Sequence, residues 1–285
     1  MPVNKARLGI LVTGVGGRSV GCQILHALTL LGDRYRIVCT DADAFSYGLY
    51  QGFNHYIVPL ANAADYVDTI VALVRREEID VVLPGTEPEV RVLASARHRL
   101  QEAGCHLVAS PPDVIDLCQD KAALYRWLEA QGIGVPRSTG TDGWRAMVAA
   151  VGFPVVAKPA GASGGSRNVA ILADAAEVER YIREFPGPES EIVFQEYVGD
   201  AESEYTVGVV VSGRGTAIDS IVMHRKLVGL SMGSSRQIDG RRYDLSTGYS
   251  QGFIVRDPEI QGFCESLAIR MGLRGPANFQ LRRHD

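Results

Sequence analysis

Short apolar runs alternate with amphipathic segments through the first part of the chain. The apolar runs have the length of buried strands, and they are expected at residues 8–13, 35–40, 55–59, 79–83 and 106–109. Between them, apolar positions recur at helical spacing over residues 20–31, 64–78 and 90–103. Strands that alternate with helices favour a parallel sheet covered by those helices. The pattern therefore predicts a Rossmann-like α/β domain over residues 1–112.

The pattern changes after Pro112. Helices are expected at residues 113–131, 144–151, 175–185 and 257–271. Strands are expected at residues 153–158, 169–172, 192–198, 205–211, 216–224 and 277–281, the first two and the fourth and fifth pairing as hairpins. The polar segment 229–248 is interpreted as a long loop, and such loops in compact units are usually functional. This half predicts a separate α+β unit.

The amino-acid composition and the net charge exclude some classes of function. The chain has 285 residues, of which 46% are hydrophobic and 22% charged, and its net charge is -4. That charge gives no electrostatic case for nucleic acid. No apolar run reaches the roughly 18 residues that span a bilayer, and residues 1–7 lack the long apolar segment expected of a signal peptide. Five scattered cysteines lack zinc spacing and indicate reduced thiols in a cytoplasmic protein. We expect small-molecule substrates, with neither nucleic acid nor membrane as partner.

A glycine cluster follows the first strand. Gly14, Gly16 and Gly17 precede a helix, as in an anion-binding turn. The strict dinucleotide motif fails at position 19, which is serine, so a tight structural turn is the competing interpretation. Asp41 and Asp43 end the second strand, where they either bind ribose hydroxyls or form a plain turn. An NAD-dependent enzyme stays open as a minor alternative.

A second glycine-rich loop follows a strand that carries one lysine. Residues 155–159 read Val-Val-Ala-Lys-Pro, and the loop behind them is Ala-Gly-Ala-Ser-Gly-Gly-Ser. Glycine lets backbone N–H groups converge on an anion, and a charge at the end of a buried strand needs a partner. The lysine precedes the glycines, so this is not a P-loop. We predict that Lys158 contacts a phosphate and that the loop closes when a ligand binds.

Charged residues near later strands have two interpretations each. Glu196 and Glu204 flank a turn, where they are either solvated carboxylates or, beside a phosphate-binding lysine, readers of adenine and ribose. His224, Arg225 and Lys226 end a strand, as a cationic site or as a solvated face.

The order of these parts resembles the ATP-grasp superfamily, and most closely the branch of carboxylate–amine ligases that is similar to the large subunit of carbamoyl phosphate synthase. The resemblance covers nearly the whole chain. It rests on Asp120-Lys121, the 155–159 strand with its loop, Phe194-Gln195-Glu196-Tyr197-Val198, Glu204-Tyr205 and Asn278-Phe279-Gln280.

The resemblance implies a domain plan and a role for each matched residue. Residues 1–112 would be the pre-ATP-grasp domain, 113–195 the small subdomain with its lid, and 196–285 the large subdomain. ATP would contact Lys121, Lys158 and the lid residues Ser163, Gly164 and Gly165. Glu196, Tyr197 and Val198 would form the adenine-binding hinge, and Glu204 would bind ribose. Arg225 or Lys226 would face the transferred phosphate, and Gln280 would lie beside Mg²⁺ or Mn²⁺.

The resemblance also implies an activity. In the family, a carboxylate is phosphorylated by ATP, and an amine or ammonia then attacks the acylphosphate. The family's Glu-x-Asn metal motif does not follow Gln280, so we expect an incomplete last subdomain. Activity of this chain alone is therefore in doubt. The alternative is a nucleotide-binding module without catalysis, or one part of a split enzyme whose partner chain completes the fold. A homo-oligomer also stays open.

The carboxylate substrate is expected between the first domain and the grasp. Glu87, Glu89 and the segment 225–242 would surround it. Within that segment, Arg236, Arg241 and Arg242 match the bidentate geometry of a carboxylate, with solvated loop arginines as the alternative.

Overall fold

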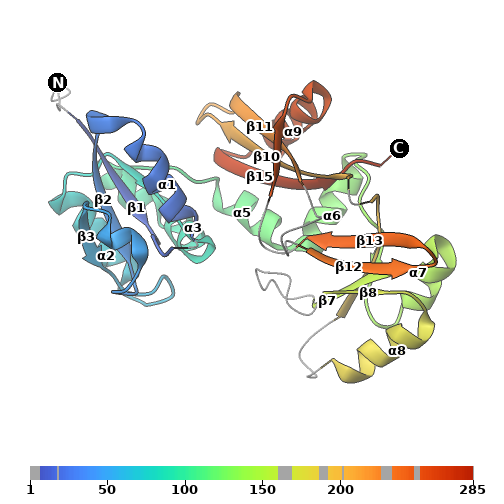
Figure 1. Cartoon of the computed structure of the whole chain (residues 1–285). Helices are drawn as coiled ribbons and strands as arrows, with labels where there is room; N and C mark the ends of the chain where they lie inside the picture. Colours follow the sequence, from blue (N-terminus) through green and yellow to red (C-terminus); the bar gives the residue numbers. More distant parts are fainter. Residues whose placement is uncertain are drawn as a thin grey trace. The chain divides into compact units, whose positions relative to one another are not determined.

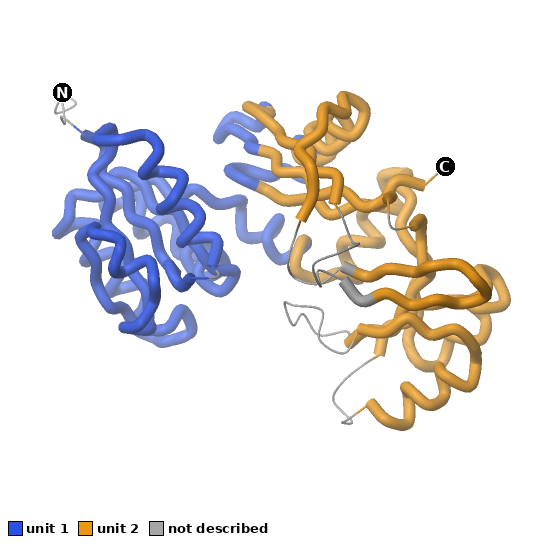
Figure 2. Tube along the Cα trace, in the orientation of Figure 1, with its two compact units in different colours: residues 1–117, 210–216, 269–276 blue, residues 118–209, 217–268, 277–285 orange. Residues whose placement is uncertain are grey.

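The computed structural model describes residues 7–17, 19–159, 169–185, 192–200, 202–225, 233–246 and 251–284. The chain divides into two compact units (Figure 2). Unit 1 consists of residues 1–117, 210–216 and 269–276, and unit 2 consists of residues 118–209, 217–268 and 277–285.

Unit 1 contains a five-stranded sheet in the order β3-β2-β1-β4-β5 (Figure 1). All of its strand pairs are parallel. Its elements are β1 (Leu8–Thr13), α1 (Val20–Thr29), β2 (Tyr35–Asp41), β3 (Asn54–Ile57), α2 (Tyr66–Arg76), β4 (Val81–Leu83), α3 (Glu87–Ser95), α4 (Arg97–Glu102) and β5 (His106–Leu107), with short 3-10 turns at Gly32–Arg34 and Tyr47–Tyr50. The Rossmann-like domain expected from the sequence is confirmed.

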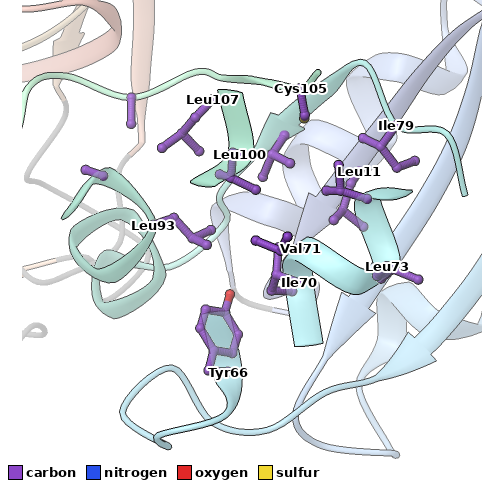
Figure 3. Packing of buried hydrophobic residues seen from close by; sticks show 14 of the residues in the cluster. Leu11, Tyr66, Ile70, Val71, Leu73, Ile79, Leu93, Leu100, Cys105 and Leu107 are labelled. Carbon is purple, nitrogen blue, oxygen red and sulfur yellow. The ribbon is translucent and has the colours of Figure 1, made fainter. Parts of the chain in front are cut away.

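Alternating side chains of β1 supply two cores, one on each face of the sheet. Leu11 packs with residues of α2, α3 and α4, including Ile70, Leu93 and Leu100 (Figure 3). Ile10 and its neighbours on the other face pack with α1 and the turn after β2. Because neighbouring residues of a strand point to opposite faces, a continuous apolar run serves a sheet that is covered on both sides.

Unit 2 holds one four-stranded sheet, most of a second four-stranded sheet and a separate hairpin. The first sheet has the order β6-β9-β7-β8, and the second has the order β14-β11-β10-β15. The elements after β5 are α5 (Pro112–Gln119), α6 (Lys121–Ala130), β6 (Ser138–Thr139), α7 (Trp144–Val151), β7 (Val155–Pro159), β8 (Ala170–Leu172), α8 (Ala175–Glu184), β9 (Ile192–Glu196), β10 (Glu204–Val211), β11 (Ala217–Arg225), β12 (Gly233–Ile238), β13 (Arg241–Ser246), β14 (Gly252–Val255), α9 (Pro258–Arg270) and β15 (Gly275–Arg282).

The strand that carries Lys158 lies at the centre of the first sheet. β7 pairs antiparallel with β8 and with β9, as the expected hairpin requires. Trp144 of α7 and Val178 of α8 pack on this sheet with Phe194. The mixture of antiparallel sheets and helices confirms the predicted α+β unit.

The expectation of a long loop over residues 229–248 is wrong for the part that the structure describes. Residues 233–246 form an antiparallel hairpin, β12–β13. The turn has positive φ at both central residues, 49° at Asp239 and 77° at Gly240. Asp-Gly is the preferred pair for such a two-residue turn, because glycine tolerates positive φ without cost. The Asp-Gly signal is visible in the sequence, but the polar composition around it hid the strands.

Candidate nucleotide-binding site

Lys158 and Gln195 meet on one face of the first sheet of unit 2. The Lys158 ammonium donates a hydrogen bond to Gln195 Oε1 at 2.6 Å. In the register of β7 and β9, Gln195 lies opposite Val156, so it is a diagonal neighbour of Lys158. Burial, and secondarily the charge of Lys121, lower the pKa of Lys158 to about 8.

Helix α6 completes this group of side chains. Its residue Tyr125 accepts a hydrogen bond from Gln195 Nε2 at 3.0 Å. The helix begins at Lys121, directly after Asp120, whose side chain caps it by accepting from the Ala123 N–H. Capping by Asp120 fixes where the helix starts, and therefore where the exposed Lys121 lies.

We call Lys121, Tyr125, Lys158 and Gln195 the lysine cluster. Two cations near each other, with a neutral amide and a phenol as neighbours, repel one another until an anion arrives. The sequence predicted both lysines. It did not single out Gln195 or Tyr125, although two-residue periodicity along β9 places Gln195 on the face of Lys158.

The expected hinge follows β9. Glu196 forms two hydrogen bonds with Arg137: its N–H donates to the Arg137 carbonyl at 2.8 Å, and its carboxylate accepts from the Arg137 N–H at 3.2 Å. The Glu196 side chain therefore holds the segment before β6. The carbonyl of Val198 accepts from Arg282 Nη1 at 2.8 Å.

Tyr197 links this hinge to the hairpin β12–β13. Its hydroxyl accepts from the Asp244 N–H and donates to the Asp244 carbonyl, both at 2.9 Å. Its ring lies edge-on to Tyr243, with 5.0 Å between the centroids. Both side-chain and main-chain groups of one hairpin strand therefore contact a single hinge residue.

Glu204 is buried between two arginines. One carboxylate oxygen pairs with Arg225, which is itself buried, and the other accepts from Arg282 Nη2 at 3.0 Å. A buried carboxylate is stable only when it is paired in this way. Two predicted site residues, Glu204 and Arg225, are thus brought together, and Arg282, which the sequence did not single out, joins them.

The arginines expected to bind a carboxylate substrate have partners within unit 2. Arg236 forms a bidentate ion pair with Glu177 and donates to the Ile171 carbonyl at 2.6 Å. The hydrogen bond from Arg236 is the largest factor that lowers the pKa of Glu177. Arg242 Nε donates to Asp244 Oδ1 at 2.9 Å.

Arg241 is exposed, and its guanidinium lies 5.3 Å from the centre of the Tyr243 ring. A pocket of about 400 Å³ beside the hinge includes Arg241 and Tyr243 in its lining, together with Glu196, Tyr197, Asp200 and Arg283.

The glycine cluster of unit 1 packs tightly against its neighbours. Gly14 has a φ of 60°, and a Cβ at this position would overlap Glu89 and Thr86. Asp41 accepts from the Asp43 N–H at 3.0 Å, which is the geometry of a plain turn. These contacts favour the structural interpretation of both motifs.

Glu89 is the buried acid of unit 1. Its carboxylate accepts from the Tyr66 hydroxyl at 3.0 Å and from the Thr86 hydroxyl at 2.8 Å. Burial raises the pKa of Glu89. Glu87, in contrast, is exposed at the start of α3.

Ser163, Gly164, Gly165 and Lys226 lie outside the described residues. Gln280 is exposed on β15. Within the described ranges, no three His, Cys, Asp or Glu side chains gather as metal ligands.

No helix in the described part of the chain is both long and apolar enough to cross a membrane. The five cysteines are free, and all but Cys118 are buried.

Comparison with known proteins agrees with this architecture. Residues 10–108 match the PylC-like N-terminal domain family. The carbamoyl phosphate synthase large chain of Rubrobacter xylanophilus is 31% identical over 230 residues, which are 79% of this chain and 20% of that protein. The chain thus matches only about a fifth of that relative's length.

Two solved structures share the fold across almost the whole chain. N5-carboxyaminoimidazole ribonucleotide synthetase from Thermotoga maritima superposes with a TM-score of 0.60 at 18% identity, covering 96% of this chain and 64% of that one. The biotin carboxylase domain of Hydrogenobacter thermophilus 2-oxoglutarate carboxylase, in complex with MgADP, ADP and bicarbonate, gives 0.59 at 16% identity, covering 98% of this chain and 61% of that one.

A parallel-sheet first domain, two antiparallel sheets and a lysine-bearing central strand together define the class. The chain has the ATP-grasp fold. Residues 10–108 match the PylC-like N-terminal domain family, and 79% of the chain is similar in sequence to part of the large chain of carbamoyl phosphate synthase.

Proposed function

We propose that this chain binds ATP in unit 2 and belongs to an ADP-forming carboxylate–amine ligase. The observation that carries the proposal is the lysine cluster. Lys158 is mostly buried, its pKa is lowered to about 8, and the hydrogen-bond partner that it has among the described residues, Gln195, is neutral. A phosphate group would supply the missing negative charge, and Lys121 would share it.

The other nucleotide contacts follow from the same arrangement. We assign the adenine to the backbone groups of the hinge at Glu196, Tyr197 and Val198, and the ribose hydroxyls to Glu204. Arg225 already contacts Glu204, so in this proposal it positions the ribose acceptor, and with Lys226 it is the candidate contact for the transferred phosphate. Ser163, Gly164 and Gly165 are proposed to close over the phosphates.

The proposed reaction has two steps. A carboxylate oxygen attacks the γ-phosphorus of ATP, the bond to the β-phosphate oxygen breaks, and ADP leaves. The amine nitrogen then attacks the acyl carbon, inorganic phosphate departs with the bonding electrons, and the nitrogen loses a proton. Lys121 and Lys158 would stabilise the charge that spreads over the transferred phosphoryl group. A closed lid would exclude water from the acylphosphate.

The described residues do not by themselves form a site for Mg²⁺ or Mn²⁺. Gln280 offers one neutral oxygen, and no three acidic, histidine or cysteine side chains gather as ligands within the described ranges. Hard divalent cations prefer several carboxylate or carbonyl oxygens. The proposed reaction therefore includes no metal-dependent step. The position of Gln280 beside a metal ion stays a prediction.

A thermal-shift experiment tests nucleotide binding. ADP and ATP should raise the melting temperature of the full chain, and Lys158→Met should abolish that shift, because the variant loses its phosphate contact. Arg145→Met is the matched control, since Arg145 is an exposed cation of α7 that pairs with Glu179. An undiminished shift in the Lys158 variant would contradict the assignment.

Turnover separates the ligase from the binding module. A ligase should release ADP only when ATP is supplied with a carboxylate, such as bicarbonate or an amino acid, together with ammonia. Nucleotide-induced stabilisation without such release would favour the second candidate, a module that lacks catalysis or needs a partner chain.

A further inference from the structure

Arg282 connects three segments of unit 2. It is the last residue of β15, and its side chain is 18% exposed. Nη1 donates to the carbonyl of Val198 at 2.8 Å. Nη2 donates to Glu204 Oε2 at 3.0 Å and to the carbonyl of Asp244 at 3.0 Å. One guanidinium therefore joins the hinge, the start of β10 and the hairpin β12–β13.

Two of these acceptors are groups that the proposed function assigns to the nucleotide. The carbonyl of Val198 belongs to the adenine-binding hinge, and Glu204 is the ribose acceptor. Adenine offers an exocyclic amine, and ribose offers two hydroxyl groups, all of them hydrogen-bond donors. A guanidinium presents its N–H donors in one rigid plane. Arg282 thus supplies from within the chain the kind of donor that a nucleoside would bring.

Glu204 has little room for a second set of donors. Its side chain is 7% exposed, and each of its two oxygens already bonds to an arginine. Ionised carboxylates can accept further hydrogen bonds, but a buried one is reached only where a neighbour moves away. Arg225 is nearly fully buried, whereas Arg282 is the more accessible of the two arginines. Arg282 is therefore the partner that can leave.

We propose that Arg282 is an internal latch, which occupies the nucleoside acceptors of the free protein and is displaced when a nucleotide binds. This inference rests on the proposed function. Displacement leaves Glu204 paired with Arg225, so its charge stays compensated. The ligand forms its own contacts only in molecules whose latch is open. The apparent affinity is therefore the affinity of the open form multiplied by the fraction of molecules in which the latch is open.

The latch also connects the hairpin to the nucleotide site. Asp244 loses one donor when Arg282 moves, while Tyr197 continues to hold its N–H and carbonyl groups. The side chain of Asp244 keeps Arg242 as its partner. Opening the latch therefore weakens one contact of the hairpin without detaching it.

Adenosine is the probe that tests the latch, because it has no phosphate that Arg282 could bind after release. Arg282→Met removes the donors but keeps an unbranched side chain of similar length. Its affinity for adenosine, measured by calorimetry on the full chain, should rise about three- to tenfold. Arg282→Lys should give a smaller rise, since a single ammonium replaces the two-pronged guanidinium.

Arg145→Met is the matched control. Arg145 is an exposed arginine of α7 that pairs with Glu179 and does not line the pocket beside the hinge, so its loss should leave adenosine affinity unchanged. Unchanged or weaker adenosine binding by a cooperatively unfolding Arg282→Met variant overturns the latch while the proposed function stands. If the unmodified chain binds neither adenosine nor ADP, the proposed function fails, and the latch fails with it.

Discussion

At the scale of single residues, Lys158 is the most informative side chain of unit 2. Its ammonium is partly desolvated and lies near a second lysine, and both effects favour the neutral form. Its pKa is lowered from 10.5 to about 8, so the free protein loses this charge within an accessible pH range. A bound phosphate would favour the charged form and raise the pKa again.

This pKa predicts a pH dependence of nucleotide binding. Below about pH 8 Lys158 is charged and binds phosphate, and above it the charge is lost. The affinity for ADP should therefore fall roughly twentyfold between about pH 7.5 and about pH 9.5, as expected for linkage to one proton. Lys158→Arg keeps its charge across this range and should give a flatter profile. Equal slopes in the two proteins would assign the pH dependence to another group.

At the scale of elements, the hairpin β12–β13 connects two separate segments of unit 2. Arg236 attaches it to Glu177 at the start of α8, and Asp244 attaches it to Tyr197 of the hinge. A hairpin that is held at both strands depends on its turn for register. The turn therefore influences groups far beyond its own two residues.

Gly240→Ala tests the turn. Residue 240 has a φ of 77°, and a Cβ there would meet no atom within 4 Å, so the cost is conformational only. We expect a loss of about 1 kcal/mol in the free energy of unfolding, measured with denaturant. Gly134→Ala is the control, because Gly134 also has open space around it but no positive φ. If both variants unfold alike, the positive-φ turn is not what limits this hairpin.

At the scale of the whole molecule, the two units offer two different nucleotide-binding motifs. Glu89 and Thr86 of unit 1 lie directly against Gly14, where a Cβ would overlap them. Within the described residues, the lysine cluster of unit 2 combines two cations with a neutral amide and a phenol. We therefore propose unit 2, and not the glycine turn of unit 1, as the nucleotide-binding unit.

Hydrogen exchange of the full chain distinguishes these motifs. ADP should slow amide exchange in β7, β9, the hinge and β15, because these segments carry the proposed contacts. The strands β1 to β5 should exchange at the same rate with and without ADP. NADH serves as the comparison ligand. Protection by NADH at residues 14–17, without protection by ADP in unit 2, would instead support the dinucleotide alternative.

Local signals in the sequence were enough for most of the fold. The helix at Trp144–Val151 and the strand ends near Lys158 follow from apolar periodicity alone, because burial of one face decides those elements. The order of the motifs was enough to predict the ATP-grasp fold and to single out Lys121 and Lys158 as candidate residues. The hairpin was missed, since its polar strands bury too few side chains to show a period.

What only the tertiary structure decided is which charged groups meet. Arg282 bonds Val198, Glu204 and Asp244, which are 84, 78 and 38 positions away along the chain. Arg236 finds Glu177 at a separation of 59. The sequence by itself determined most of the strands and helices and singled out the two lysines as candidates, because those follow from neighbours along the chain. Ion pairs between distant segments depend on how sheets and hairpin pack, so the partners of Glu204 and the latch at Arg282 emerged only from the folded chain.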